Sequence, residues 1–192
     1  MNQDQLQALL TKVQQGALAV PDALHRLRTL PYENLGFASL DHHRALRQGF
    51  PEVIFCEGKT VSQVVAIAKT LLRKNNALLA TRVEPSVARA LLRVSKRAVY
   101  HEAARVVAIA PPKLVRRGAV LIVTAGTADI PVAEEARVTA DIMGSKTDTL
   151  YDVGVAGLHR LLGQQERLHD ARALIVVAGM DGVLPSVVGG LV

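Results

Sequence analysis

The stretch that decides the fold is residues 120–136, which read Val-Leu-Ile-Val-Thr-Ala-Gly-Thr-Ala-Asp-Ile-Pro-Val-Ala-Glu-Glu-Ala. Its apolar first half is typical of a strand buried on both faces of a parallel sheet. Small residues then form a turn, and Pro131 fits the first turn of a helix, whose free amides attract anions. Because open α/β sheets bind ligands at the carboxyl ends of their strands, this turn is a candidate anion site.

The same order of features recurs twice further along the chain. Residues 173–187 repeat the apolar strand, the glycine turn with one Asp and the helix-opening Pro. Residues 149–160 give a shorter strand, a glycine turn and the start of a helix. Structural βα turns also use glycine, but three such turns in order, two of them with an Asp, favour one ligand site along one edge of a sheet.

Composition limits the class of protein. Of the 192 residues, 49% are apolar and 3% aromatic, so the core must consist of Ala, Val, Leu and Ile. No apolar run approaches the roughly 18 residues of a membrane span, and the polar opening is not typical of a signal peptide. The single Cys excludes an intramolecular disulfide. We therefore expect a cytoplasmic protein that binds no membrane.

The formal charge of +6 raises the question of nucleic acid as a partner. Arginines are spread along the chain without interleaved aromatic residues or a known recognition motif, which favours solvated helix faces. We therefore expect no nucleic-acid partner. A small phosphate-bearing ligand would use some of the same arginines.

The pattern predicts two domains, residues 1–110 and 113–192, which meet at Pro111 and Pro112, because two prolines interrupt both helix and sheet. The first is expected to be a small helical and α/β domain. Helices are expected at 2–15, 21–29, 61–74 and 85–93, strands at 51–55, 77–81, 98–101 and 105–110, and an irregular connector at 32–50.

Three groups of residues in the first domain suggest chemistry but have simpler explanations. Residues 57–60, Glu-Gly-Lys-Thr, lack the first glycine of a P-loop, so Thr60 is expected to be a helix N-cap. Cys56 has no neighbouring His to lower its pKa and is expected to be structural. His42 and His43 diverge in direction and lack a third ligand at a suitable spacing, so no metal site is expected.

The candidate site residues of the second domain follow its three strands. His159 suits proton transfer and Arg160 suits phosphate binding, or the two form a capping or surface pair. Asp129 and Asp181 either contact a ribose hydroxyl or a cationic ring, or stabilise the following helix by about 0.5–1 kcal/mol. The same two interpretations hold for the acids at 134–135, placed in the first turn of a helix.

At these residues the chain resembles the LarB family, which begins biosynthesis of the nickel-pincer nucleotide, the cofactor of lactate racemase. The matching segments are residues 35–38, 41–60, 124–136, 151–160 and 177–186. The resemblance implies a pyridinium-3,5-biscarboxylic acid mononucleotide synthase. Such an enzyme is a carboxylase and hydrolase that adds CO2 at C5 of the pyridinium ring of nicotinic acid adenine dinucleotide and releases AMP. CO2 or bicarbonate is the implied co-substrate, no covalently bound cofactor is implied, and a role for Mg2+ in anhydride hydrolysis is left open.

The second half is also similar to the PurE family of aminoimidazole ribonucleotide carboxylases and mutases, and His159 falls at the catalytic histidine of that family. This similarity implies a flavodoxin-like three-layer α/β/α domain with a parallel sheet, assembled as a homo-octamer. Gly126 replaces a phosphate-binding Ser and Val183 replaces a His, which argues against a purine carboxylase. We expect His159 and Asp181 to be catalytic, and a larger set to bind the nucleotide. That set is Gly126, Thr127, Asp129, Gly154, Gly157, Arg160, Gly179, Gly182 and Ser186.

The implied reaction requires a catalytic cysteine, and this sequence has none at the position where the resemblance places it. The resemblance puts the catalytic Cys of the family some tens of residues beyond the third turn, and the sequence stops at Val192. Cys56 belongs to a different motif. We therefore expect a shortened protein with weak or absent carboxylation, whose uncovered helices depend on oligomer contacts. A nucleotide-binding module without catalysis is the alternative.

Overall fold

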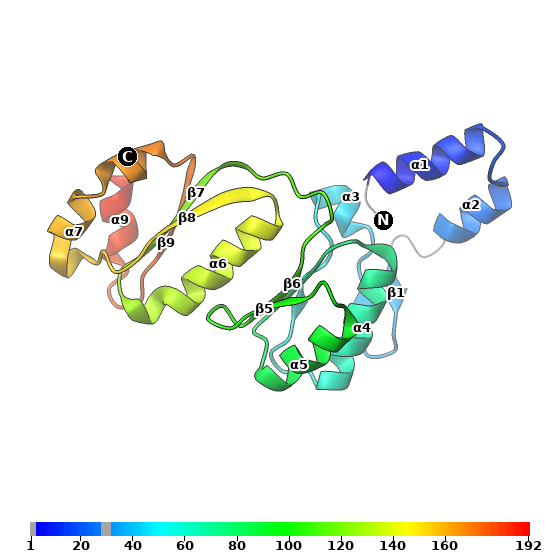
Figure 1. Cartoon of the computed structure of the whole chain (residues 1–192), viewed down its shortest axis with the longest axis horizontal. Helices are drawn as coiled ribbons and strands as arrows, with labels where there is room; N and C mark the ends of the chain where they lie inside the picture. The colour runs from blue at the N-terminus through cyan, green and yellow to red at the C-terminus, as the bar shows by residue number, and fades with distance from the viewer. Residues whose placement is uncertain (1–2, 28–31) are drawn as a thin grey trace. The chain divides into compact units, whose positions relative to one another are not determined.

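The computed structural model describes residues 3–27 and 32–192, and the chain divides into two compact units, Met1–Ala98 and Val99–Val192 (Figure 1). The first unit begins with α1 (Gln3–Gln14) and α2 (Val20–Leu27), which confirms the first two predicted helices. Residues 28–29, placed in the second helix by the sequence pattern, lie outside the described residues. No described helix combines the length and the apolar character needed to cross a bilayer.

Residues 32–50 are not the irregular connector expected from sequence. They contain a hairpin of β1 (Glu33–Asn34) and β2 (Ser39–Leu40), followed by the short helix α3 (Arg44–Gln48). The side chain of Asn34 accepts a hydrogen bond from the Gly36 amide at 2.7 Å, and Gly36 has a φ of 86°. Asn34 and Gly36 therefore encode a tight turn, which a search for long apolar strands overlooks.

A βαβα segment completes the first unit. It consists of β3 (Ile54–Phe55), α4 (Val61–Lys74), β4 (Leu78–Thr81) and α5 (Pro85–Val94). The two strands pair in parallel, and α4 has the predicted limits. Val64, Ala68 and Leu71 are buried at helical spacing on one face of α4, which explains why this sequence forms a packed helix.

The second unit begins with an antiparallel pair and continues into a strand–turn–helix series. The pair is β5 (Val99–His101) and β6 (Val106–Ile109). The series is β7 (Arg117–Thr124), η1 (Thr127–Asp129), α6 (Ile130–Ile142), β8 (Ser145–Leu150), η2 (Val155–Gly157), α7 (Leu158–Leu162), α8 (Gln165–Asp170), β9 (Ala173–Val177) and α9 (Val183–Gly189).

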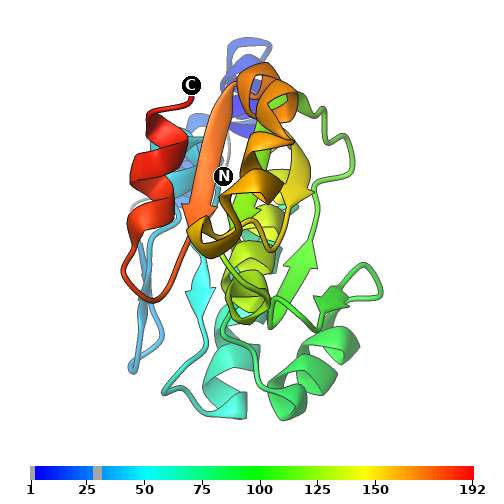
Figure 2. The ribbon, with the colours of Figure 1, turned by 90° about the vertical axis from the view of Figure 1, so that its left-hand side faces the viewer.

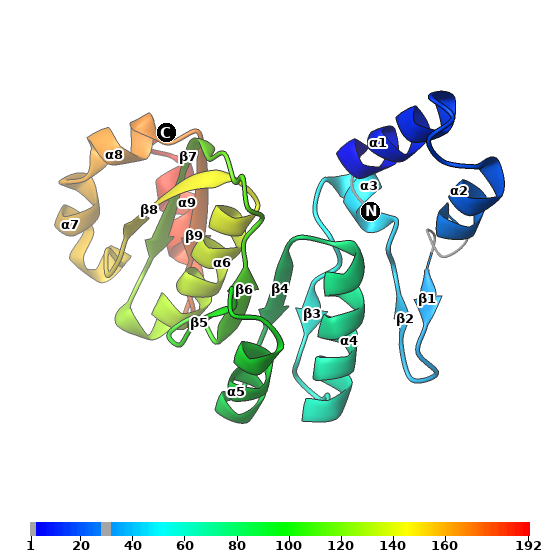
Figure 3. The same ribbon diagram turned by 45° about the vertical axis from the view of Figure 1, so that its right-hand side comes forward.

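The series forms a parallel sheet of strand order β8-β7-β9, which confirms the α/β class and the predicted parallel sheet. Val123 of β7 lies opposite Leu150 of β8, and Thr124 lies opposite Val177 of β9, so the three strands end at the same edge. Helix α6 covers one face of the sheet, and α7, α8 and α9 lie on the other face (Figure 3). The order second-first-third is that of the first three strands of a flavodoxin-like sheet.

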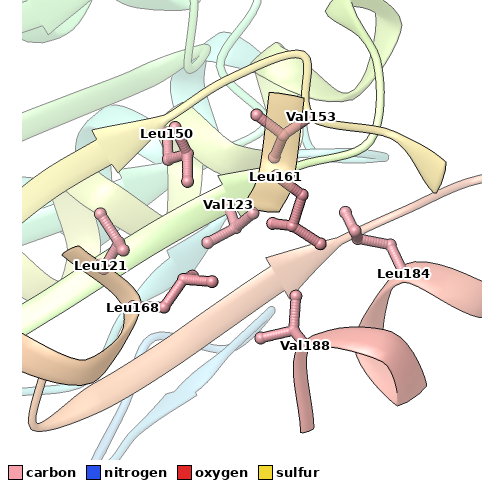
Figure 4. Close-up of a cluster of buried hydrophobic side chains, with 8 residues drawn as sticks. All are labelled: Leu121, Val123, Leu150, Val153, Leu161, Leu168, Leu184 and Val188. Carbon is pink, nitrogen blue, oxygen red and sulfur yellow. The ribbon is translucent and has the colours of Figure 1, made fainter. Parts of the chain in front are cut away.

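The apolar run that opened the sequence analysis is buried on both sides. Leu121 and Val123 join a core cluster with side chains from α7, α8 and α9 (Figure 4). Ile122 alternates to the other face and is fully buried. A strand with helices on both faces must be apolar at every position, which explains why this segment has no polar alternation.

Candidate functional site

The candidate site is a set of three turns at the carboxyl ends of β7, β8 and β9. The first turn is residues 125–129, the second 151–157 and the third 178–182, and we call them together the ligand edge. The amide of Ala125 donates to the carbonyl of Val177 at 3.0 Å, and the amide of Val153 donates to the carbonyl of Thr124 at 3.0 Å. Backbone hydrogen bonds therefore tie the start of the first turn to β9 and the second turn to β7.

The first and second turns pack directly against each other at Gly154. A Cβ atom at this position would lie 2.6 Å from the carbonyl oxygen of Ala125, which is too close for any side chain. Gly154 is therefore required by the approach of two backbones. The sequence analysis named this glycine as a nucleotide-binding residue, and the structure adds a packing reason for it.

Asp129 connects the first turn with the third. One carboxylate oxygen accepts a hydrogen bond from the Gly126 amide at 2.9 Å, and the other would lie 3.5 Å from a Cβ atom at Gly179. Asp129 is the N-cap residue of α6, but its side chain makes no capping hydrogen bond to that helix. Its carboxylate closes the first turn instead.

Arg160, at the start of α7, is held over the second turn. It donates to the carboxylate of Asp152 at 2.7 Å, and a Cβ atom at Gly157 would lie 2.7 Å from its Nε atom. The glycine thus leaves room for the guanidinium to lie over the backbone. Asp152 was not among the residues predicted from sequence, although its place shortly after a strand was a signal. Its backbone has a φ of 59°, which is uncommon for a residue other than glycine.

The predicted residues of the third turn and its helix are open to solvent. The chain leaves β9, reverses and enters α9 (Figure 2). Asp181 has a φ of 66°, and Gly182 rather than Asp181 is the N-cap of α9, so Asp181 is not the expected cap. Pro185 does not open the helix as predicted but lies in its first turn, because α9 begins at Val183. Met180 beside them is 92% exposed.

Three predicted polar side chains at the ligand edge have no partner within the described part of the chain. The side chains of His159 and Ser186 are exposed and make no hydrogen bond or ion pair there, and the same holds for Asp181. Thr127 is exposed in η1. The structure therefore brings the predicted residues to one edge and leaves several polar side chains available to a ligand.

A hydrogen-bonded cluster behind the second turn escaped the sequence analysis. The hydroxyl of Tyr151 donates a short hydrogen bond to Glu134 of α6, and Arg137 donates two bonds of 2.8 Å to the same carboxylate. The bonds from Arg137 lower the pKa of Glu134, whereas burial and the bond to Glu134 raise the pKa of Tyr151 to about 12. Glu134 is the fifth residue of α6, so its expected place in the first turn was wrong.

In the first unit, Cys56 and the two histidines have structural partners. Cys56 is 4% exposed, and burial raises the pKa of its thiol to about 11, which agrees with the structural interpretation. His42 is buried and lies 3.1 Å from Glu33, while the ring of His43 lies 3.1 Å from a guanidinium nitrogen of Arg47. Within residues 3–27 and 32–192, no three His, Cys, Asp or Glu side chains gather to hold a metal ion.

The fold and the ligand edge together define an α/β protein with three βα turns at one edge of a parallel sheet. Residues 32–111 match the LarB/PurE-like N-terminal domain. An uncharacterized protein of Methanocaldococcus jannaschii is 34% identical over 198 residues, which cover 97% of this chain and 77% of that protein. The chain therefore contains a LarB/PurE-like N-terminal domain and belongs to the same family as this archaeal protein.

Proposed function

We propose that the ligand edge binds nicotinic acid adenine dinucleotide and that the chain is a carboxylase and hydrolase of the LarB type. The observation that carries the proposal is the convergence of three small-residue turns at one sheet edge. Gly154 touches Ala125, and Asp129 reaches Gly179, so the three turns form one continuous surface. Family membership and the location of this surface support a nucleotide as the ligand.

The phosphates of the dinucleotide are assigned to Arg160. Arg160 lies over the second turn, and a planar guanidinium binds phosphate through two parallel hydrogen bonds. The start of α6 does not add to this site as the sequence led us to expect, because the amide of Ile130 donates to the carbonyl of Thr127 and Pro131 has no amide hydrogen.

The pyridinium ring is assigned to the third turn. Asp181 offers a negative charge to a cationic ring, and Met180 and Val183 give exposed apolar surface beside it. His159 is the residue proposed for proton transfer, since it is exposed at the same edge and has no competing partner in the described part of the chain.

The described residues supply a nucleotide site but no reactive thiolate. The only cysteine in the sequence is Cys56, and a buried thiol with a pKa of about 11 is almost entirely protonated at neutral pH. We therefore propose nucleotide binding as the main property of these 192 residues, with weak or absent carboxylation. CO2 or bicarbonate as co-substrate and a homo-oligomeric assembly, an octamer by family likeness, belong to the same proposal.

Calorimetric titration of the chain with nicotinic acid adenine dinucleotide, AMP and aminoimidazole ribonucleotide in parallel tests the proposal. Binding of the dinucleotide and AMP without the purine ribonucleotide is the expected result. Binding of the purine ribonucleotide alone would favour purine carboxylation instead, and no binding of any of the three would refute the nucleotide site. Asp129→Ala is expected to weaken binding while the chain stays folded, and Glu166→Ala on α8 is the control.

A further inference from the structure

The side chain of Tyr151 joins the second turn to helix α6. Tyr151 directly follows β8, and its hydroxyl donates to the carboxylate of Glu134. That carboxylate is only 17% exposed, and Arg137, one turn further along α6, fixes it with two hydrogen bonds. The acceptor of the Tyr151 hydroxyl is therefore itself held in place.

The other side of the second turn is held by β7. The amide of Asp152 donates to the hydroxyl of Thr124 at 3.0 Å, and the next amide, that of Val153, donates to the carbonyl of Thr124. Thr124 is fully buried, so this attachment cannot move independently of the sheet. The second turn is thus fixed at two points, one on β7 and one on α6.

These attachments lead directly to the proposed phosphate-binding group. Asp152 follows Tyr151 in the chain, and its carboxylate holds the guanidinium of Arg160 at 2.7 Å. The path from Glu134 to Arg160 therefore consists of a hydrogen bond, one peptide unit and an ion pair. A shift of the Tyr151 ring would move Asp152, and with it the guanidinium.

We infer that Glu134 is a positioning residue, which fixes the Tyr151 hydroxyl and so holds the second turn with Arg160 set to receive a phosphate of the ligand. This inference rests on the proposed function. Glu134 touches no reacting atom in this role. Its pairing with Arg137 alone would satisfy the carboxylate, so the link to Tyr151 is the feature that relates α6 to the ligand edge.

The test compares AMP affinity and thermal unfolding of the whole chain across matched variants. Tyr151→Phe and Glu134→Ala remove the hydrogen bond, whereas Glu134→Gln keeps a carbonyl oxygen that can accept it but loses the charge that pairs with Arg137. We expect Tyr151→Phe and Glu134→Ala to weaken AMP binding about tenfold, as the loss of one such bond predicts, and Glu134→Gln to stay within about threefold of the unsubstituted protein. Glu166→Ala should match the unsubstituted protein.

A purely structural role predicts a different pattern. In that case the affinity of Glu134→Gln would fall together with that of Glu134→Ala, and both would follow the thermal midpoint. Equal affinity of Tyr151→Phe and the unsubstituted protein would overturn the inference and leave the proposed function intact. Failure of the unsubstituted protein to bind AMP or the dinucleotide would overturn both. An ultraviolet titration adds a spectroscopic check, because Tyr151 should ionise at a lower pH in Glu134→Ala than in the unsubstituted protein.

Discussion

Both units contain parallel strands followed by helices, but they differ in whether the polar groups at the carboxyl ends of these strands have hydrogen-bond partners. In the first unit, Thr60 caps α4 through a reciprocal bond with Gln63. Lys59 donates to the carbonyl of Phe55 at 2.7 Å. In the second unit, no described side chain caps α6 or α9, and His159 and Asp181 lack partners among the described residues.

This difference shows why residues 57–60, which are closer to a known motif, are the weaker candidate for a ligand site. Residues 57–60 resemble the end of a phosphate-binding loop, but the side chains of Lys59 and Thr60 already form hydrogen bonds within the first unit. The turns of the second unit have no complete motif, and the side chains of His159, Asp181 and Ser186 have no partner among the described residues. Satisfied hydrogen bonds, more than glycine spacing, separate a structural βα turn from a binding one.

Replacing one glycine by alanine in each unit should give the largest difference in stability and in AMP binding. Gly154→Ala is expected to destabilise the second unit by about 1–3 kcal/mol, because its Cβ would lie 2.6 Å from the Ala125 oxygen, and to abolish AMP binding. Gly58→Ala has open space but a φ of 75°, so a cost of about 1 kcal/mol without any change in AMP binding is expected. Denaturant unfolding and calorimetry measure both. Normal binding by Gly154→Ala would remove the distinction between the edges.

Removing one cation from each edge should change binding in one case only. Arg160→Gln is expected to weaken AMP binding about ten- to hundredfold, the loss expected for hydrogen bonds to a charged group. Lys59→Gln is the matched control and should leave affinity unchanged, because Lys59 already donates to Phe55. Equal losses in the two variants would point to general electrostatic attraction rather than a site.

The cap of the first unit should affect stability without affecting binding. Thr60→Ala is expected to lower the free energy of unfolding by about 1 kcal/mol, since the Gln63 amide loses its acceptor. Thr60→Ser keeps a hydroxyl and should recover most of this loss. A drop in AMP affinity in Thr60→Ala would contradict the view that this edge is structural.

Protonation of one histidine in each unit, the buried His42 and the half-buried His101, should give the smallest effect. Burial lowers the pKa of His42, with Lys74 adding to the shift, and burial lowers that of His101, with Arg137 adding to it. Below the ordinary value of 6.5 the unfolded chain binds protons that the folded chain resists, so stability should fall as the pH drops through and below 6.5. Denaturant unfolding between about pH 7 and pH 5 measures the slope. His42→Gln and His101→Gln should each flatten part of it, and unchanged slopes would contradict the assigned shifts.

Helices and strands with a sustained apolar pattern could be predicted from sequence. The limits of α4 follow from apolar positions at helical spacing and from Thr60, and β7 follows from its unbroken apolar run. The hairpin at 33–40 was missed because two-residue strands have no detectable period. Its signal was the turn chemistry of Asn34 and Gly36.

The sequence predicted that the three turns lie at one edge of the sheet, but it did not predict the hydrogen bonds that connect them to one another and to α6. Order along the chain and the rule for parallel sheets were enough to group the three turns. The bond between Glu134 and Tyr151 spans 17 residues and depends on how α6 lies over β8, which no local pattern records. Asp129 was placed at the correct turn, yet its partner, the Gly126 amide, required the turn geometry.

Strand β9 has a consequence for how the molecule behaves at high concentration. It reads Ala-Leu-Ile-Val-Val, pairs with β7 on one side, and has no described strand on its other side. Beside it, Val132, Met143 and Ile175 line an apolar groove against α6. An unpaired apolar strand is a template onto which another chain can add hydrogen bonds. We therefore expect the apparent size of this protein in solution to rise with its concentration, and a strand-forming peptide that pairs with β9 to reduce that rise.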